Sequence, residues 1–194
     1  MKKLKVQSGI LKGKNIPAAI TTTAKENFTP ALLKKAVFSL LENFQLKGNI
    51  EKSDSVFADL FAGSGQMAFE AISRGFSRSV LFEIDPRRFS TLADGIARNM
   101  NYKIALFKRD SFRYYKNAIS PEEKSVIFFG DPPYSFWENK IEDLHLLAEK
   151  IISINDKKII LIFQSPLNPD WKNFNSRKYG NHYLLIYSWF NSDN

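Results

Sequence analysis

The stretch Asp-Leu-Phe-Ala-Gly-Ser-Gly at residues 59–65 decides the fold. An apolar run of strand type, residues 56–61, leads into it. A helix is predicted from Gln66 to Arg74, with Gly75 as its C-cap signal. A strand that passes through glycines directly into a helix is typical of a parallel α/β sheet. The glycines also allow the backbone to approach a ligand closely.

Strands and helices continue to alternate downstream of this turn, and the two last strands are expected to pair antiparallel at one edge. The expected strands are at residues 56–61, 79–84, 104–107, 125–129, 159–163, 174–179 and 183–190. The expected helices are at residues 66–74, 86–100, 111–119 and 137–152. The pattern predicts a doubly wound, mostly parallel seven-stranded α/β sheet.

The first quarter of the chain carries nearly all of its net charge. The 194 residues have a formal net charge of +8. Residues 1–52 hold 10 Lys, no Arg and 3 Glu, whereas the remainder is almost balanced. We therefore expect a basic N-terminal extension at 1–52 and a main domain at 53–194. A basic element beside a neutral domain suits a phosphate backbone, although a merely solvated basic tail gives the same pattern.

Within the extension, a small β-hairpin is expected over residues 3–17, with Gly13 near its tip. Such a hairpin needs a packing partner, either nucleic acid or the main domain. A helix is expected to start at Thr29-Pro30, with Thr29 as N-cap and Pro30 as its first residue. Its apolar face includes Leu33, and its lysines are expected on the opposite face. The candidate nucleic-acid contacts are Lys12, Lys14, Lys34 and Lys35.

Composition restricts the chemistry. The absence of Cys excludes disulfides, thiol nucleophiles and cysteine-ligated metals. His145 and His182 are the only histidines, so we expect no metal site. No run of 18 apolar residues and no signal-type segment occurs, so we expect no membrane span and a cytoplasmic monomer.

Polar side chains follow four of the predicted strands. The carboxyl ends of parallel strands lie at one rim of the sheet, where α/β proteins bind their ligands. We therefore expect these side chains to line one pocket. They fall in the clusters Asp59 to Gly65, Glu83 to Asp85, Asp110-Ser111 and Asp131 to Tyr134.

The first clusters indicate a nucleotide-like cofactor. Gly63, Gly65 and Ala68 match the spacing of dinucleotide binders, and Glu83 lies where a ribose-binding acid would be, so a nicotinamide oxidoreductase stays open. Asp59 disfavours a pyrophosphate and suits an ammonium group, such as that of S-adenosylmethionine. The candidate cofactor-binding residues are Asp59, Phe61, Ala62, Gly63, Ser64, Gly65, Glu83, Ile84, Asp110 and Ser111.

Asp131-Pro132-Pro133-Tyr134 predicts a site for an exocyclic base amine. Such an amine is a poor nucleophile because its lone pair is delocalised into the ring. Hydrogen bonds to the Asp131 carboxylate and the Pro132 carbonyl would orient the nitrogen, and the two prolines would hold that carbonyl rigidly. Tyr134 could stack on a base taken out of its helix. The candidate catalytic residues are Asp131, Pro132, Pro133 and Tyr134.

These residues resemble the class I S-adenosylmethionine-dependent methyltransferases that carry a D/N-P-P-Y/F motif. Nearly the whole chain is similar to the bacterial 16S ribosomal RNA guanine-N2 methyltransferase family. The similarity rests on the basic hairpin, Ala36 to Leu41, Asp59 to Gly65, Glu70 to Gly75, Glu83 to Asp85 and Asp131 to Tyr134. It implies a Rossmann-like fold and methylation of a guanine N2 in 16S rRNA, on an assembling small subunit.

The chain departs from the family pattern at three places. Residues 27–30 lack the usual Arg-Pro-Thr, Lys35 replaces a usual glutamate, and Gln164 stands where an acid often follows the fifth strand. An adenine-N6 methyltransferase on DNA or RNA would hold its base amine with the same residues, Asp131 to Tyr134. This amine clamp therefore does not distinguish the two bases. A nicotinamide oxidoreductase and a non-catalytic RNA-binding module also stay open as functions of this chain.

Overall fold

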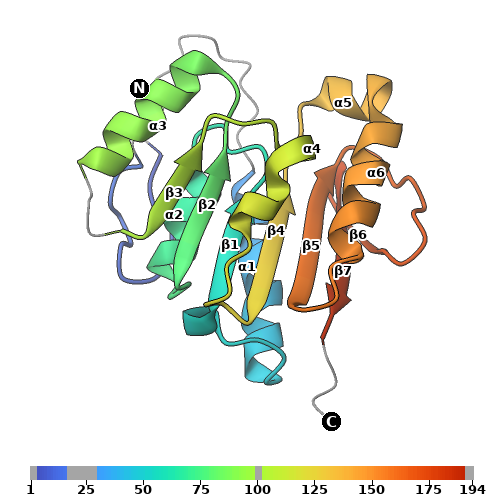
Figure 1. Ribbon diagram of the computed structural model, residues 1–194, viewed down its shortest axis with the longest axis horizontal. Coiled ribbons are helices and arrows are strands. Elements are labelled where there is room, and N and C mark those ends of the chain that lie inside the picture. Colours follow the sequence, from blue (N-terminus) through green and yellow to red (C-terminus); the bar gives the residue numbers. More distant parts are fainter. Residues whose placement is uncertain (1–3, 17–29, 99–101, 191–194) are drawn as a thin grey trace.

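A computed structural model describes residues 4–16, 30–98 and 102–190, and in these ranges seven strands form one sheet with helices on both faces (Figure 1). The strands are β1 (Ser55–Asp59), β2 (Arg78–Phe82), β3 (Ile104–Phe107), β4 (Ser125–Gly130), β5 (Lys158–Ser165), β6 (Asn175–Tyr179) and β7 (His182–Trp189). Their order is β3-β2-β1-β4-β5-β7-β6. The first five strands are parallel, and β7 runs antiparallel to both β5 and β6. The predicted doubly wound sheet with an antiparallel edge is confirmed.

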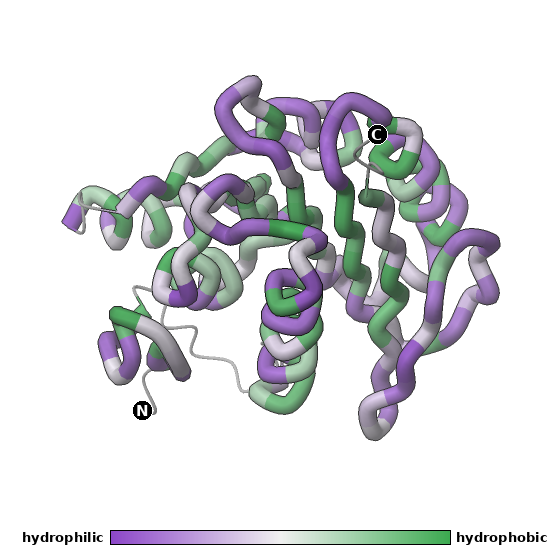
Figure 2. The backbone as a smooth tube through the Cα atoms, turned by 90° about the horizontal axis from the view of Figure 1, so that it is seen from below, coloured by the Kyte–Doolittle hydropathy of each residue, from purple (hydrophilic) through white to green (hydrophobic). Residues whose placement is uncertain are grey.

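Alternation along the buried strands directs their side chains to two helical layers. Phe57 and Phe129 pack toward α1 (Ala31–Leu46) and α2 (Gln66–Ser73), and α3 (Pro86–Ala97) covers the same face. Ala58 and Phe128 pack on the other face, which is covered by α4 (Ser111–Tyr114), α5 (Tyr134–Asn139) and α6 (Ile141–Ile152). Two short 3-10 helices, η1 (Lys52–Asp54) and η2 (Tyr115–Ala118), complete the described elements. In Figure 2 the apolar segments concentrate in the strands.

The N-terminal segment forms a small turn that packs against the main domain. Lys5 and Asn15 form an antiparallel bridge. Leu11 is buried against α2, and its N–H donates to Ser73 Oγ at 2.9 Å. A Cβ at Gly9, where φ is +80°, would overlap the Ser73 carbonyl. Within residues 4–16 the predicted hairpin is therefore a turn closed by one isolated bridge, without regular strands, and α2 is its packing partner.

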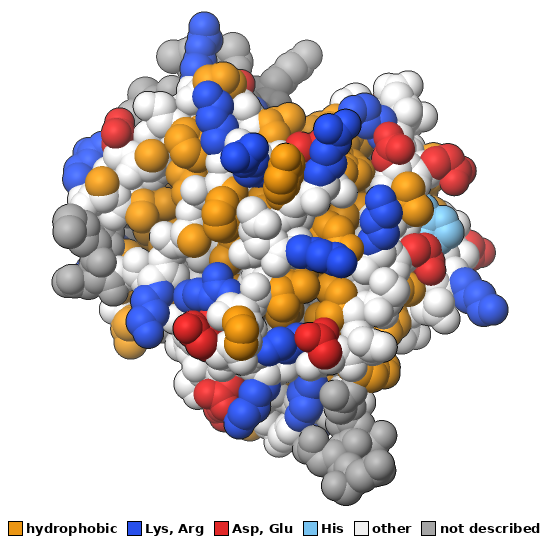
Figure 3. All heavy atoms as spheres, viewed as in Figure 1, with side chains coloured by type: hydrophobic (Ala, Val, Ile, Leu, Met, Phe, Trp, Pro, Cys, Tyr) orange, Lys and Arg blue, Asp and Glu red, His pale blue; other side chains and the backbone are white. Residues whose placement is uncertain are grey.

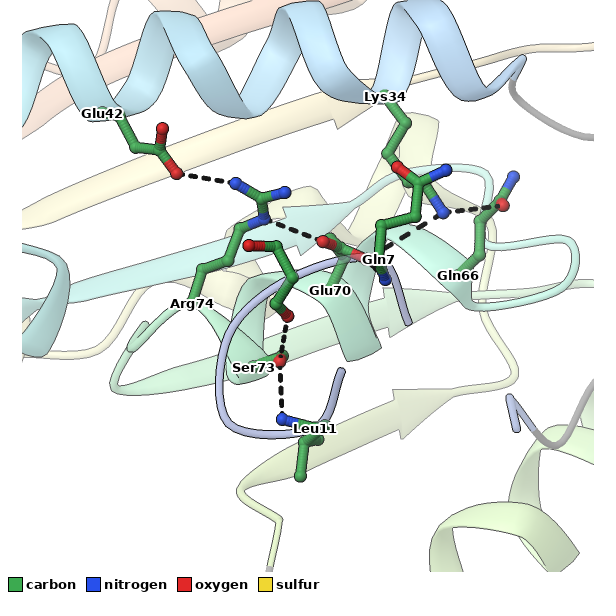
Figure 4. Close-up of polar contacts among 9 residues, drawn as sticks. Gln7, Leu11, Lys34, Glu42, Gln66, Glu70, Ser73 and Arg74 are labelled. Atoms are coloured by element: carbon green, nitrogen blue, oxygen red, sulfur yellow. Dashed lines mark hydrogen bonds and ion pairs between the residues drawn. The ribbon is translucent and has the colours of Figure 1, made fainter. Parts of the chain in front are cut away.

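Glu70 ties the N-terminal turn to α1 and α2 (Figure 4). Its carboxylate is fully buried and accepts the Gln7 N–H at 2.7 Å and Arg74 Nε at 2.8 Å. Lys34 Nζ lies 3.9 Å from Glu70 Oε2, and Arg74 also contacts Glu42 at 2.6 Å. A buried carboxylate is costly unless cations and N–H donors surround it, so these contacts fix α1 and the turn on α2. Residues before and after position 52 thus share one core.

Three predicted helices differ from the structure. The helix expected at 111–119 is α-helical only in α4 and continues as the 3-10 helix η2. Pro30 is the N-cap of α1 and not its first residue, while Thr29 falls outside the described residues. The helix expected at 137–152 is divided in two, because Lys140 takes φ −139° and ψ 27° between α5 and α6. The division lets α5 begin at Tyr134, at the rim of the sheet.

Candidate active site

One pocket of about 530 Å³ opens at the carboxyl ends of the parallel strands. Pockets of this size hold small molecules and cofactors. Four predicted clusters, far apart in the chain, meet in its wall. Its lining includes Asp59, Phe61, Ala62, Gly63, Ser64, Glu83, Ile84, Asp110, Ser111, Asp131, Pro132, Pro133 and Tyr134.

Gly65 is the one predicted cofactor residue outside the lining. It is buried as the N-cap of α2, with φ +72°, and its N–H donates to the Ala62 carbonyl at 2.7 Å. A Cβ there would lie 2.7 Å from Leu92 Cδ2. Gly63 also has a positive φ, +52°, and it does line the pocket. The glycines therefore shape the turn, and only Gly63 presents backbone to a ligand.

Glu83 holds this turn against the end of β2. Its two carboxylate oxygens accept the Gly63 N–H at 3.0 Å and the Asp85 N–H at 2.8 Å. Burial raises the pKa of Glu83, and the hydrogen bond from Asp85 opposes that shift. Asp85 in turn caps α3 by accepting the N–H groups of Arg87 and Arg88, as its sequence position predicts. The carboxylate of Glu83 faces the pocket while it organises the pocket's backbone.

Asp59 ends β1 at the base of the pocket and is 2% exposed. Its Oδ1 accepts the Phe61 N–H at 3.3 Å. Burial raises the pKa of Asp59 to about 8, the Phe61 N–H counteracts this, and the charges of Asp131 and Glu83 add to it. A buried carboxyl with a raised pKa in a cleft is a candidate functional group, and its ionised form would suit a cationic ligand group.

The far wall of the pocket combines an apolar surface with a polar edge. Ile84 is 62% exposed although it follows a buried strand. Asp110 caps α4 by accepting the Phe112 N–H at 3.0 Å, and the buried Ser111 follows it. An exposed aliphatic side chain can pack on the face of a purine ring, and a nearby acceptor can bind an amino group at the edge of the ring.

The clamp residues occupy the opposite wall. Pro132 is buried, and Tyr134 is 39% exposed at the start of α5. The Tyr134 ring stacks on His182 with 6.3 Å between ring centroids, and its hydroxyl lies 3.3 Å from His182 Nδ1. Burial and the Asp131 charge raise the pKa of Tyr134. His182 therefore supports the tyrosine of the clamp.

Several pocket residues were not predicted as ligand contacts because nothing local in the sequence marks them as such, and three cationic side chains and one glutamine stand out among them. Arg88, Arg109 and Lys140 line the pocket and bring positive charge to it. Gln164, which the sequence marks only as a departure from the family pattern, lies in the wall beside the clamp. Lys and Arg side chains are spread over the face in Figure 3, including its upper edge, to which β1, β2 and β4 point in Figure 1.

Three of the four predicted nucleic-acid lysines are exposed, namely Lys12, Lys14 and Lys35. The prediction that Lys34 lies on the solvent face of α1 is wrong. Its side chain is buried, its Nζ contacts Gln66 Oε1 at 3.4 Å, and it pairs with Glu70. Burial lowers the pKa of Lys34, and the Glu70 carboxylate partly restores it.

The described part of the chain contains neither a membrane-spanning helix nor a cluster of metal ligands. No helix within 4–16, 30–98 and 102–190 has the length and apolar character to cross a membrane. The same ranges contain no group of three or more His, Asp or Glu side chains arranged to hold a metal ion.

The strand order and the rim pocket define the class of protein. The antiparallel β7 inserted between β5 and β6 distinguishes this sheet from the parallel dinucleotide-binding order, which argues against a nicotinamide oxidoreductase. The fold is that of the class I methyltransferases, whose methyl donor is S-adenosylmethionine. The N-terminal domain of human METTL16 in complex with SAH has the same fold, with a TM-score of 0.67 and 12% identity over 91% of this chain and 77% of that one.

The chain belongs to the family described as conserved hypothetical protein 95, which matches residues 4–188. It is 31% identical over 137 residues to ribosomal RNA small subunit methyltransferase D of Buchnera aphidicola, covering 68% of this chain and 63% of that protein. It is 37% identical over 99 residues to the uncharacterized methylase RP545 of Rickettsia prowazekii, covering 50% of this chain and 41% of the relative. The matches thus span less than two thirds of either relative.

Proposed function

We propose that this protein is an S-adenosylmethionine-dependent methyltransferase that modifies the exocyclic N2 of a guanine in 16S rRNA, within an assembling small ribosomal subunit. The observation that carries the proposal is the single pocket in which the glycine turn and the Asp131 to Tyr134 clamp face each other. The similarity to the Buchnera small-subunit rRNA enzyme supports the choice of RNA.

The cofactor half of the pocket fits S-adenosylmethionine group by group. The buried Asp59 carboxylate suits the ammonium group, and the Glu83 carboxylate suits the ribose hydroxyls. The adenine ring fits over Ile84, with its amino group toward Asp110. When bound, the cofactor supplies an electrophilic methyl group on a positively charged sulfur.

The clamp half orients the acceptor. Asp131 and the Pro132 carbonyl accept the two N–H bonds of the amine, which directs the nitrogen lone pair at the methyl carbon. S-adenosylmethionine would supply the methyl group and keep the electrons of the broken carbon–sulfur bond, and the nitrogen that gains the methyl group would release one proton to Asp131 or to solvent. The Asp131 carboxylate stabilises the positive charge that develops on the nitrogen, while Tyr134 stacks on the base. Exposed Lys12, Lys14 and Lys35 are proposed to hold the RNA backbone.

The test is nucleoside mass spectrometry of 16S rRNA from cells that lack the protein, before and after incubation with pure enzyme and S-adenosylmethionine. We expect one N2-methylguanine to be missing and then restored. Asp131→Ala should abolish the restoration and leave binding of S-adenosylmethionine by calorimetry unchanged. Binding of NAD in place of S-adenosylmethionine, or restoration by Asp131→Ala, would refute the proposal.

A further inference from the structure

A buried amide oxygen lies unpaired in the wall of the pocket. Gln164 is 6% exposed and lines the pocket. Its Oε1 is one of two buried side-chain polar atoms, among the residues that the structure describes, with no hydrogen-bond partner; the other is Gln45 Oε1. Buried polar atoms in folded proteins nearly always have partners, so an unpaired acceptor in a cleft indicates a donor on the ligand.

The sheet register places this amide beside the amine clamp. Gly130 of β4 pairs with Phe163 of β5 in parallel register. One residue further on each strand, Asp131 and Gln164 are therefore neighbours, and alternation turns both side chains to the face that Phe129 occupies. Gln164 thus borders the clamp half of the pocket, away from the Glu83 and Ile84 wall.

The Watson–Crick edge of guanine carries a hydrogen-bond donor that could pair with Gln164 Oε1. Next to its N2 amine, guanine has an N1–H, which is a hydrogen-bond donor. Next to its N6 amine, adenine has an unprotonated N1, which is an acceptor. When Asp131 and the Pro132 carbonyl accept both amine hydrogens, the N1 position next to the amine lies toward Gln164.

We infer that Gln164 Oε1 accepts the N1–H of the target guanine and thereby distinguishes guanine from adenine. This inference rests on the proposed function and adds to it the residue that recognises the base. An adenine held by the same clamp would set its N1 lone pair against Oε1. A Glu at this position retains an acceptor, whereas an apolar residue of the same length retains none.

The experiment compares Gln164→Met, Gln164→Glu and wild type on small subunits isolated from cells lacking the protein, with labelled S-adenosylmethionine and nucleoside mass spectrometry. Gln164→Met keeps the length of the side chain and removes its polar amide. We expect its kcat/KM for the subunit to fall about 10- to 100-fold, in line with the loss of one base-specific contact. The Kd for S-adenosylmethionine and the Tm should match wild type, and the fraction of label on adenine should rise. Gln164→Glu should recover most of the loss.

The matched control is Gln45→Met. Gln45 also has a buried, unpaired Oε1, but it lies near Gly48 and Glu51, in a separate pocket away from the clamp. This variant should keep the wild-type kcat/KM.

The ways in which the experiment can fail are distinguishable. N2-methylguanine formed at an unchanged rate by Gln164→Met overturns this inference alone. A parallel loss of cofactor affinity and Tm in that variant also overturns it, since Gln164 would then be purely structural. Label on adenine with the wild-type enzyme overturns both the inference and the guanine assignment of the proposed function.

Discussion

The stability of the protein should fall with rising pH, and Asp59→Asn should remove the part of that dependence that comes from Asp59, leaving the smaller contribution of Glu83, whose pKa is also raised. The pKa of this buried carboxyl is raised to about 8 from 3.8, chiefly by burial. Between these two values the folded protein binds a proton that the unfolded chain has released. Stability therefore decreases as pH rises through this window and levels off above about pH 8.

The separation of about four pKa units corresponds to about 5–6 kcal/mol over the whole window, at about 1.4 kcal/mol per pH unit. Between pH 5.5 and 7.5 the free energy of unfolding of Asp59→Asn, relative to wild type, should rise by about 2–3 kcal/mol. Asn is neutral and isosteric, and its side-chain oxygen can still accept the Phe61 N–H. Urea unfolding of the ligand-free protein at five pH values would measure the slope.

The control is Asp85→Asn. Asp85 also lines the pocket, but hydrogen bonds from Arg88 and Arg87 lower its pKa, so its carboxylate is ionised in both states throughout this pH range. Its substitution should shift stability by a constant amount. Parallel pH profiles for wild type and Asp59→Asn would refute the argument that burial holds a proton on Asp59.

Contacts around the pocket and the N-terminal turn lead to three more predictions. Gly65→Ala should lower the free energy of unfolding in urea by about 1–3 kcal/mol, because its new Cβ would lie 2.7 Å from Leu92 at a φ of +72°. Gly48→Ala, at φ +73° with open space around it, should lower it less, and equal losses would contradict the role of the Leu92 contact. Glu70→Gln should lower the free energy of unfolding by about 3–5 kcal/mol, because it leaves the buried cations Lys34 and Arg74 without this carboxylate. The control is Glu42→Gln at a half-exposed position, and a similar loss in both variants would contradict the role of the Glu70 network. Reversing the charges of Lys12 and Lys14 to Glu should weaken RNA binding and flatten its salt dependence in filter binding, and an unchanged slope would return the turn to a packing role.

The sequence predicted the central strands β1, β4 and β5 well because they are buried on both faces. Each central strand is a short continuous apolar run bounded by glycines or charges, and such runs differ clearly from the amphipathic helices between them. Residues 104–107 were predicted with the observed bounds. The pocket was predictable for the same reason, since topology alone brings the ends of parallel strands together.

The errors concern side chains whose partners are distant in sequence. Lys34 follows Leu33 on a helix whose apolar spacing did not distinguish a solvated lysine from a buried one. Its partner Glu70 lies far along the chain, and only the docking of α1 on α2 brings the two together. His182 was likewise unpredictable, because its contact with Tyr134 depends on β7 starting at the rim.

The strand order also bears on how the proposed cofactor site and the proposed base site can share one pocket. From β1 the chain proceeds outward through β2 and β3 on one side of the sheet, and then returns to β4 and β5 on the other side. The connections beside β1 and β4 therefore lie on opposite faces of the sheet, and a crevice opens between these two strands. Asp59 and Asp131 stand on either side of that switch point, close enough for the charge of one to raise the pKa of the other. The residues at the ends of β1, β2 and β3 form the proposed cofactor half, and those following β4 and β5 form the proposed base half. A sulfonium methyl group held from one side and an amine held from the other would meet at this crevice, where the Asp131 carboxylate would favour the transfer of positive charge from sulfur to nitrogen.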